Sequence, residues 1–224
     1  MYPKYSVLLF MTAVVGLLSC KNNDNVFKTV VNAHINFVNA SADTLNFYVN
    51  GTRQNSLSSI YPTSQTFYLD VPDGQQNYQF KKAGSPNALL NVPLKLDSGV
   101  SYSIYVAGET PDKVFYGIDT LLAGNAPDTA IVRFVNAAPD AGSLTVTIGD
   151  TVYFKNKAFR STSGYFFSGS GQKVIKVYQA GSVLPKIDTI IAFQQKTTYT
   201  LFSKGLINGK GTAAFGVGLA INVN

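Results

Sequence analysis

The residues that could perform acid–base, nucleophilic or metal chemistry are few in this chain. Its 224 residues include one histidine, His34, one cysteine, Cys20, and one glutamate, Glu109. A metal site needs three or four ligands, and a Ser-His-Asp triad needs a histidine between the serine and the aspartate. A glycosidase needs paired carboxylates. His34 has no cysteine or carboxylate cluster near it in the sequence. We therefore predict that the protein is not an enzyme, with no catalytic residues, no metal and no cofactor.

A seven-residue segment, here called the heptad, occurs twice, and each copy ends on an aspartate that could bind a metal ion or act as an acid or base. It reads FVNASAD at residues 37–43 and FVNAAPD at residues 134–140, and it ends on Asp43 and on Asp140. A calcium site or an acid–base pair is one interpretation. The two carboxylates, however, hold equivalent positions in separate copies of the heptad. We therefore predict that each caps the same turn through side-chain to backbone hydrogen bonds.

The N-terminal residues are predicted to direct export. Lys4 precedes an apolar run at residues 7–18. This run is shorter than the about 20 residues that a membrane-spanning helix needs, so residues 1–19 are typical of a signal peptide. The run closes on Leu17-Leu18-Ser19-Cys20, and Cys20 is the only thiol of the chain. A secreted protein with one unpaired thiol is unusual unless that thiol is covalently modified.

The segment Leu17-Leu18-Ser19-Cys20 resembles the lipobox of bacterial lipoproteins. The resemblance implies that Cys20 is the lipid attachment site and that the lipid holds the protein on a membrane. The alternative is an incidental cysteine after an ordinary secretory signal. The polar residues 20–32 are predicted to form a tether. In Bacteroidota-type lipoproteins an acidic residue after the cysteine favours surface export. Asp24 therefore predicts an outer membrane lipoprotein facing the cell surface, with the periplasmic face as the alternative.

The composition predicts an all-β protein. Only 13% of the residues are charged, and the chain favours Thr, Val, Tyr, Phe, Ser and Asn, with 19 Gly available for turns. No part of the chain after residue 20 shows sustained helical periodicity. In residues 45–49 and 144–148, apolar side chains instead alternate with more polar ones. This alternation is typical of strands with one face on a core.

An internal repeat divides the chain into two modules. The heptads lie 97 residues apart, and the same offset pairs Tyr68 with Tyr165 and Gly108 with Gly205. Such a constant offset indicates a tandem duplication. We predict module 1 at residues 33–118, a linker at 119–129 and module 2 at 130–224. Each module has several short segments separated by turn residues, which predicts two tandem immunoglobulin-like β-sandwich domains.

Two tyrosines are predicted to be structural. Tyr102 follows the turn at residues 97–99 (DSG), and Tyr199 holds the equivalent place in module 2. This arrangement is typical of a tyrosine corner, in which the hydroxyl hydrogen-bonds to backbone a few residues upstream.

The repeated pattern also resembles a known family. VRFVNAAPD at residues 132–140, the AGS turns at 83–85 and 180–182, and the late tyrosine-rich strands are similar to the bacterial domain-of-unknown-function family numbered 4397. The resemblance implies immunoglobulin-like modules on secreted proteins and lipoproteins. Module 1 departs from it at Ala42, where module 2 has Pro139, and over residues 54–66. The family has no established catalytic residues, so the resemblance bears on fold and location only.

The charge of the two modules is unequal. Module 1 has five basic and six acidic residues, net −1, whereas module 2 has ten basic and three acidic residues, net +7. Basic residues interleaved with aromatic ones favour an anionic polysaccharide as ligand. The alternative is a solvated sheet face. Nucleic acid is not an expected partner of an exported lipoprotein. The candidate glycan-binding residues are Lys155, Lys157, Arg160, Lys173 and Lys176.

Five Asp-Thr pairs are each followed by an apolar residue. The pattern is similar to the acceptor of the O-glycosylation system of exported Bacteroidota-type proteins. The alternative is turn chemistry, in which Asp ends a turn and a β-branched Thr opens a strand. The candidate O-glycosylation residues are Thr44, Thr120, Thr129, Thr151 and Thr189.

Together these patterns predict an exported, lipid-anchored, non-catalytic binding or scaffold protein of the cell envelope. Its expected partners are the membrane, through the N-terminal lipid, and an anionic polysaccharide or an envelope protein. The competing hypothesis is a structural stalk or adhesin component that recognises a protein partner.

Overall fold

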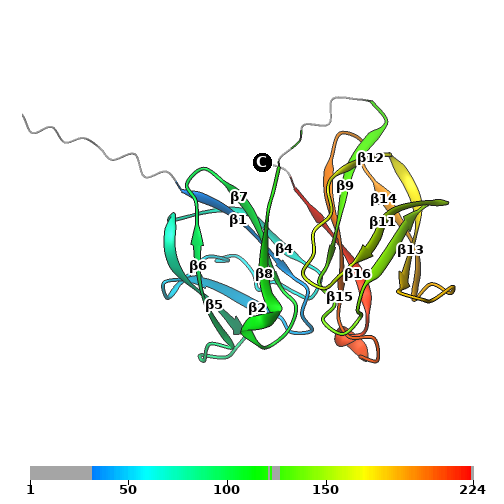
Figure 1. Ribbon diagram of the computed structural model, residues 1–224. Coiled ribbons are helices and arrows are strands. Elements are labelled where there is room, and N and C mark those ends of the chain that lie inside the picture. The colour runs from blue at the N-terminus through cyan, green and yellow to red at the C-terminus, as the bar shows by residue number, and fades with distance from the viewer. Residues whose placement is uncertain (1–31, 121, 123–126, 223–224) are drawn as a thin grey trace, which may run out of the picture. The chain divides into compact units, whose positions relative to one another are not determined.

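The computed structural model describes residues 32–120, 122 and 127–222, and in them the chain is built almost entirely of β-strands. Two short 3-10 turns, η2 (Pro111–Lys113) and η3 (Gly211–Ala213), are the other elements of these residues. No helix among them is long and apolar enough to cross a membrane. The strands form two β-sandwiches, so the predicted fold class is confirmed (Figure 1). The predicted signal peptide, Cys20 and most of the tether lie outside the described residues.

Module 1 consists of two four-stranded sheets. Its strands are β1 (Ala33–Asn39), β2 (Leu45–Val49), β3 (Thr52–Arg53), β4 (Gln65–Val71), β5 (Gly74–Lys82), β6 (Leu90–Leu96), β7 (Ser101–Val106) and β8 (Val114–Ile118). One sheet has the order β4-β1-β7-β8 and the other has the order β3-β2-β5-β6. All neighbours are antiparallel except β1 and β7, which pair in parallel.

Module 2 repeats this topology strand for strand. Its strands are β9 (Thr129–Asn136), β10 (Leu144–Ile148), β11 (Thr151–Lys157), β12 (Phe166–Gly169), β13 (Gly171–Gln179), β14 (Ile187–Phe193), β15 (Thr198–Lys204) and β16 (Gly216–Ile221). The sheet orders are β12-β9-β15-β16 and β11-β10-β13-β14, and β9 pairs in parallel with β15. The duplication detected in the sequence is therefore a duplication of topology.

Each module has its own apolar core between its two sheets. In module 1 the rings of Phe37, Phe47 and Phe80 are completely buried, and their centroids lie 5.1 to 5.7 Å apart. In module 2 the rings of Phe134 and Phe154 stack with centroids 5.8 Å apart. Phe37 and Phe134 are the first residues of the two heptads, so one reason for the repeat is that each copy supplies a core phenylalanine.

The asparagine of each heptad holds the turn that follows it. Asn39 Nδ2 donates to the backbone oxygens of Asp43 and Ile60 at 2.7 and 2.9 Å. The side chain of Asn136 makes the same kind of contact, because its Nδ2 donates to the oxygens of Gly142 and Lys157, both at 2.9 Å. Both asparagines are completely buried. Leaving a buried amide without a hydrogen bond is unfavourable, so the contacts of this asparagine are a second reason for the repeat.

The prediction that Asp43 and Asp140 cap the same turn is wrong. The Asp43 carboxylate pairs with Lys82 Nζ at 3.1 Å. The Asp140 carboxylate accepts from the backbone nitrogen of Ile207 at 3.0 and 3.2 Å, in the loop that follows β15. The buried asparagines already fill the turn, so the two carboxylates are left for different contacts.

The predicted tyrosine corners are confirmed in both modules. The Tyr102 hydroxyl accepts from the backbone nitrogen of Asp97 at 3.1 Å, and the Tyr199 hydroxyl accepts from that of Gln194 at 3.0 Å. Both rings are almost completely buried. These two tyrosines therefore fix the crossing from one sheet to the other.

Candidate functional site

The two modules meet along a contact surface, here called the seam. It has an apolar cluster of its own, separate from the two module cores. Module 1 contributes Val38, Ala40, Tyr105, Ala107 and Phe115, and module 2 contributes Val135, Ala137, Phe202 and Ala220, with Phe159 packed against them. The heptads serve both clusters, because side chains alternate along a strand. Phe37 and Phe134 face the cores, whereas Val38 and Val135 face the seam.

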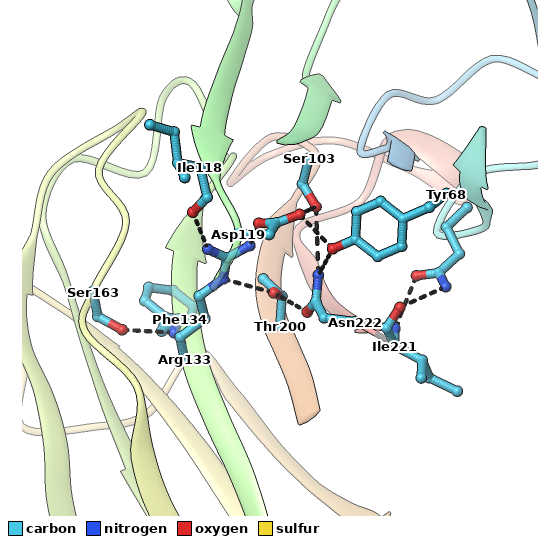
Figure 2. Close-up of polar contacts among 11 residues, drawn as sticks. Tyr68, Ser103, Ile118, Asp119, Arg133, Phe134, Ser163, Thr200, Ile221 and Asn222 are labelled. Carbon is cyan, nitrogen blue, oxygen red and sulfur yellow. Dashed lines mark hydrogen bonds and ion pairs between the residues drawn. The ribbon is translucent and has the colours of Figure 1, made fainter. Parts of the chain in front are cut away.

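A buried ion pair crosses the seam. Arg133 of β9 donates from Nη2 to the carboxylate of Asp119, which follows β8 (Figure 2). The side chain of Arg133 is 1% exposed and that of Asp119 is 0% exposed. Arg133 also donates to the backbone oxygen of Ile118 at 3.0 Å and to Thr200 Oγ1 at 2.8 Å. The guanidinium carbon lies 4.9 Å from the centroid of the Tyr165 ring.

Hydroxyl and amide groups complete the hydrogen bonding around this pair. The hydroxyls of Tyr68 and Ser103 both donate to Asp119 Oδ2, at 2.6 and 2.7 Å. Asn222 Nδ2 donates to the Tyr68 hydroxyl at 3.1 Å, and Thr200 Oγ1 donates to Asn222 Oδ1 at 2.6 Å (Figure 2). A buried ion pair is tolerated only when its remaining donors and acceptors are satisfied, and these contacts satisfy them.

A second polar contact closes the seam at the edge of β4. Gln65 Nε2 donates to the backbone oxygen of Ile221 at 3.0 Å, and Gln65 Oε1 accepts from the nitrogen of the same residue at 2.9 Å. A side-chain amide here takes the place of a backbone partner for β16. The seam thus joins the start of β4 to the end of the last strand.

The electrostatics of the seam hold its groups in one protonation state. Burial raises the pKa of Tyr68 well above its ordinary value, and the neighbouring Asp119 carboxylate raises it further. Burial alone would lower the pKa of Arg133, but the adjacent Tyr105 and Asp119 raise it above the ordinary value. Burial likewise raises the pKa of Tyr105 and that of Tyr165. The arginine therefore stays charged and the tyrosines stay neutral throughout the physiological pH range.

A cavity of about 360 Å³ lies where loops of both modules meet. Its lining includes the turn of the first heptad, the loop after β7 and the loop after β15. The lining residues are Ala40, Ser41, Ala42, Asp43, Ala107, Gly108, Glu109, Thr110, Lys113, Pro139, Gly205, Leu206 and Ala213. The cavity thus brings the end of one heptad close to Pro139 of the other.

Lys82 bridges the two acidic residues of this cavity. Its Nζ lies 3.0 Å from Glu109 Oε1 and 3.1 Å from Asp43 Oδ2. Hydrogen bonding to Glu109 and Asp43 raises the pKa of Lys82, and hydrogen bonding to Lys82 lowers the pKa of Glu109. The Glu109 side chain is 59% exposed, so solvent screens these charges strongly. Within the described residues no group of three or more His, Cys, Asp or Glu side chains is placed to hold a metal ion.

The five candidate glycan-binding residues do not all lie on one face. Lys173 and Lys176 are three residues apart on β13, so they point to opposite faces of its sheet. Lys176 is paired with Asp188, whereas Lys173 is paired with Ile191, which packs against the module core. Arg160 lies elsewhere, with its guanidinium carbon 6.0 Å from the centroid of the Phe115 ring in module 1.

Lys155 and Lys157 lie on β11, at the edge of the same sheet as β13. Lys155 is exposed and Lys157 is half-buried. Because Asn156 between them has a φ of 50°, the strand does not alternate regularly here. Lys157 pairs with Leu144, whose side chain is buried. Glycan binding by these residues stays a prediction.

The candidate O-glycosylation residues differ in exposure. Thr120 and Thr151 are exposed, whereas Thr44, Thr129 and Thr189 are half-buried. The aspartate before Thr120 is Asp119, whose carboxylate belongs to the seam. At this pair the aspartate therefore has a structural role independent of any modification.

The residues of the seam network were not among the predicted site residues. One signal for Arg133 was present in the sequence, since a charged residue stands inside the apolar run AIVRFV at residues 130–135. A charge in such a strand needs a buried partner. Nothing local to Asp119 identified it as this partner, because it lies 14 residues before Arg133 in the chain. Asn222 joins the network through Thr200 and Tyr68, which both lie far before it in the sequence.

Comparison with known proteins identifies a family, and the solved structures that are similar include one with a weak likeness over most of the chain. The model of a family described as a domain of unknown function, DUF4397, matches residues 33–147 and again residues 130–215. A comparison with curated proteins found no match. The chain is similar to a solved family CBM26 module of Amy13K from Eubacterium rectale in complex with maltoheptaose, with 7% identity, a TM-score of 0.27, and coverage of 86% of this chain and 98% of that chain. A likeness this weak carries no information on the ligand.

Proposed function

This chain belongs to the DUF4397 family, and we propose that it is a lipid-anchored, non-catalytic binding or scaffold protein of the cell envelope. The observation that carries the proposal is the seam, with its shared apolar cluster and its buried ion pair. Two modules joined in this way would present their outer surfaces in one fixed relation. That property suits a protein that holds a ligand or a partner away from a membrane.

The two parts of the seam have different roles in this proposal. Burial of apolar side chains such as Phe115 and Phe202 supplies the favourable free energy. A buried ion pair adds little net stability, because removing both charges from water costs about as much as their attraction returns. Its contribution is specificity. Arg133 and Asp119 are satisfied only when the modules meet in one register.

Attachment to the membrane is assigned to Cys20. A lipid on this residue would anchor the chain, and the residues up to 32 would separate module 1 from the membrane. We place the protein in the outer membrane, facing the cell surface, with Asp24 as the supporting residue. Radiolabelled palmitate should label the full-length protein in an expressing bacterium and should not label a Cys20→Ser variant. Unlabelled wild-type protein would overturn the anchor.

Binding of an anionic polysaccharide is assigned to module 2, which carries the net charge of +7. Lys155 on β11 and Lys176 on β13 belong to one sheet and lie at least partly in solvent. The test uses residues 21–224, which lack Cys20, on an array of neutral and anionic polysaccharides at two salt concentrations. Salt-sensitive binding to anionic glycans is expected, and neutralising Lys155 and Lys176 should abolish it.

The matched control is Lys95→Gln, which removes one exposed lysine from β6 of module 1. It should leave binding unchanged. If Lys95→Gln weakens binding as much as the module 2 variants, the interaction reflects total charge and the assignment to module 2 fails. Absence of binding at both salt concentrations favours the competing function, a stalk or adhesin component that recognises an envelope protein, for which a rigid seam is also required.

We assign O-glycosylation to Thr120 and Thr151, the two candidate threonines that are exposed. An intact mass of native protein above that of the lipidated polypeptide is the expected result. Substitution of both threonines by valine should remove part of the excess mass. A native mass equal to that of the lipidated polypeptide alone would end this assignment.

A further inference from the structure

Module 1 has a pocket that shares one residue, Gln65, with the polar contacts of the seam and none with the network around Arg133 and Asp119. Its volume is about 350 Å³, and it lies between β4 and the chain that follows β3. The lining residues are Gln54, Asn55, Ser56, Leu57, Ser58, Ile60, Gln65, Thr66, Phe67 and Leu69. None of them carries a charge. The pocket therefore offers apolar surface together with amide and hydroxyl groups, and no partner for an ion.

One wall of the pocket exists because module 1 departs from module 2 here. The strand β3 is two residues long, whereas its counterpart β11 has seven. Asn55 holds the chain that replaces the missing strand. Its Oδ1 accepts from the backbone nitrogen of Phe47 at 2.8 Å, and its Nδ2 donates to Asn46 Oδ1 at 3.0 Å and to the oxygen of Ser58 at 2.6 Å. Asn55 is 7% exposed, so this wall is fixed before any ligand arrives.

The other wall displays an aromatic ring in a strained position. Phe67 has a φ of 60°, in the left-handed region that a bulky residue rarely adopts. Its side chain is 52% exposed, although burial would ordinarily be favoured. The preceding Thr66 is fixed because its Oγ1 accepts from the backbone nitrogen of Phe37 at 2.9 Å. By the 97-residue offset, module 2 has Gly164 at this position and so lacks the ring.

Strain that the surrounding fold maintains is typical of functional sites. Across the pocket, Leu57 is fully exposed at 100%. A solvent-exposed aromatic ring beside amides and hydroxyls matches the two kinds of surface of a sugar ring. The C–H face of a pyranose packs on an aromatic face, and its hydroxyls exchange hydrogen bonds with amide and hydroxyl side chains. Binding sites in general combine apolar walls with a few placed polar groups.

We propose that the pocket formed by residues 54–60 and β4 binds a neutral saccharide, with Phe67 as the stacking surface. This site is separate from the basic residues of module 2, so it stands if binding of anionic glycans by module 2 fails. Its chemistry also predicts that binding is independent of salt, unlike the salt-sensitive binding expected of module 2. Since no lining residue is charged, binding should not weaken as ionic strength rises.

The experiment titrates residues 21–224, without Cys20, with malto-, cello-, xylo- and manno-hexaose, followed by backbone amide NMR. At least one oligosaccharide should shift resonances of residues 54–60 and 65–69, equally at low and high salt. Phe67→Ala should weaken the interaction at least tenfold, and Phe67→Tyr should retain it. The matched control is Phe167→Ala, which removes a phenylalanine 66% exposed in module 2 and should have no effect.

A second variant tests whether the loss of binding could come from a change in folding. Leu57→Ser alters a fully exposed side chain and should also weaken binding without a change in the melting temperature. Two results would overturn the proposal. One is the absence of any shift with all four oligosaccharides, and the other is binding that persists in Phe67→Ala. An apolar peptide that shifts the same resonances where no sugar does would assign the pocket to a protein partner instead.

Discussion

Arg133 of β9 and Asp119 at the end of β8 form an ion pair that is shielded from solvent on all sides, with side chains 1% and 0% exposed. The first residue belongs to module 2, and the second directly follows the last strand of module 1. Arg133 makes its other two hydrogen bonds to Ile118 and Thr200, one on each side of the seam. One guanidinium group thus connects the two modules.

Breaking this pair from one side should be costly. Asp119→Asn is expected to lower the free energy of unfolding by about 3–5 kcal/mol, because it leaves a buried charge without its partner. The double variant Arg133→Met, Asp119→Leu should cost much less, since it removes both charges and keeps apolar volume. Urea unfolding followed by tyrosine fluorescence measures both. Equal losses in the single and double variants would show that Arg133 and Asp119 are not coupled.

The tyrosine corners should contribute similarly in the two modules. Tyr102→Phe and Tyr199→Phe each remove one hydroxyl that accepts from a partly buried backbone N–H. Each substitution should lower the free energy of unfolding by about 1 kcal/mol, the usual contribution of a hydrogen bond. Tyr116→Phe is the control, because the Tyr116 ring is 44% exposed at the surface. An effect of Tyr116→Phe equal to the other two would contradict a specific role for the corners.

Alkaline pH should unfold the protein rather than titrate its buried tyrosines in place. Burial raises the pKa of Tyr78 to about 12 from its ordinary value of 10.0, and it raises that of Tyr68 further. A folded-state pKa above the unfolded one gives stability that is complete below pH 10 and is lost as pH rises through the folded-state pKa. Tyrosinate absorbance of the buried residues should therefore appear together with loss of circular dichroism. Full ionisation near pH 10 in a folded protein would contradict this.

The Lys82 contacts predict a small dependence on acid pH. Lys82 holds the pKa of Glu109 below its ordinary value of 4.5, so this contribution to stability is present above that value and is lost as pH falls through the lower, folded-state pKa. NMR titration of the Glu109 carboxyl carbon should give a low pKa in the wild type and an ordinary one in Lys82→Gln. High salt should reduce the difference. Identical pKa values in the two proteins would exclude the contact in solution.

The fold could be read from the sequence because its signals are local and occur twice. Alternation of side chains along residues 45–49 and 144–148 indicated strands, and the 97-residue offset indicated two modules. The positions of Tyr102 and Tyr199 indicated the two tyrosine corners, which the hydrogen bonds of their hydroxyls confirm. Each of these patterns involves residues that interact with close neighbours in the chain or with their own sheet.

The seam and the pocket of module 1 depend on contacts that no local pattern carries. Asn222 reaches Tyr68 across 154 positions, and Gln65 reaches Ile221 across 156. Divergence between the copies was visible at residues 54–66, but its consequence was not. The shortened β3, the buried Asn55 and the positive φ of Phe67 arise only when the two sheets are assembled. The spread of the basic residues over different faces likewise follows from strand register.

We infer that the seam makes one rigid unit of the two modules. The most direct measurement is the distance distribution between spin labels at Lys95→Cys in module 1 and Lys186→Cys in module 2, both exposed positions, in residues 21–224, where no native cysteine remains. Pulsed electron paramagnetic resonance should give one narrow distribution, and Asp119→Asn should broaden it. A broad distribution in the protein with an intact seam would show instead that the two modules move independently.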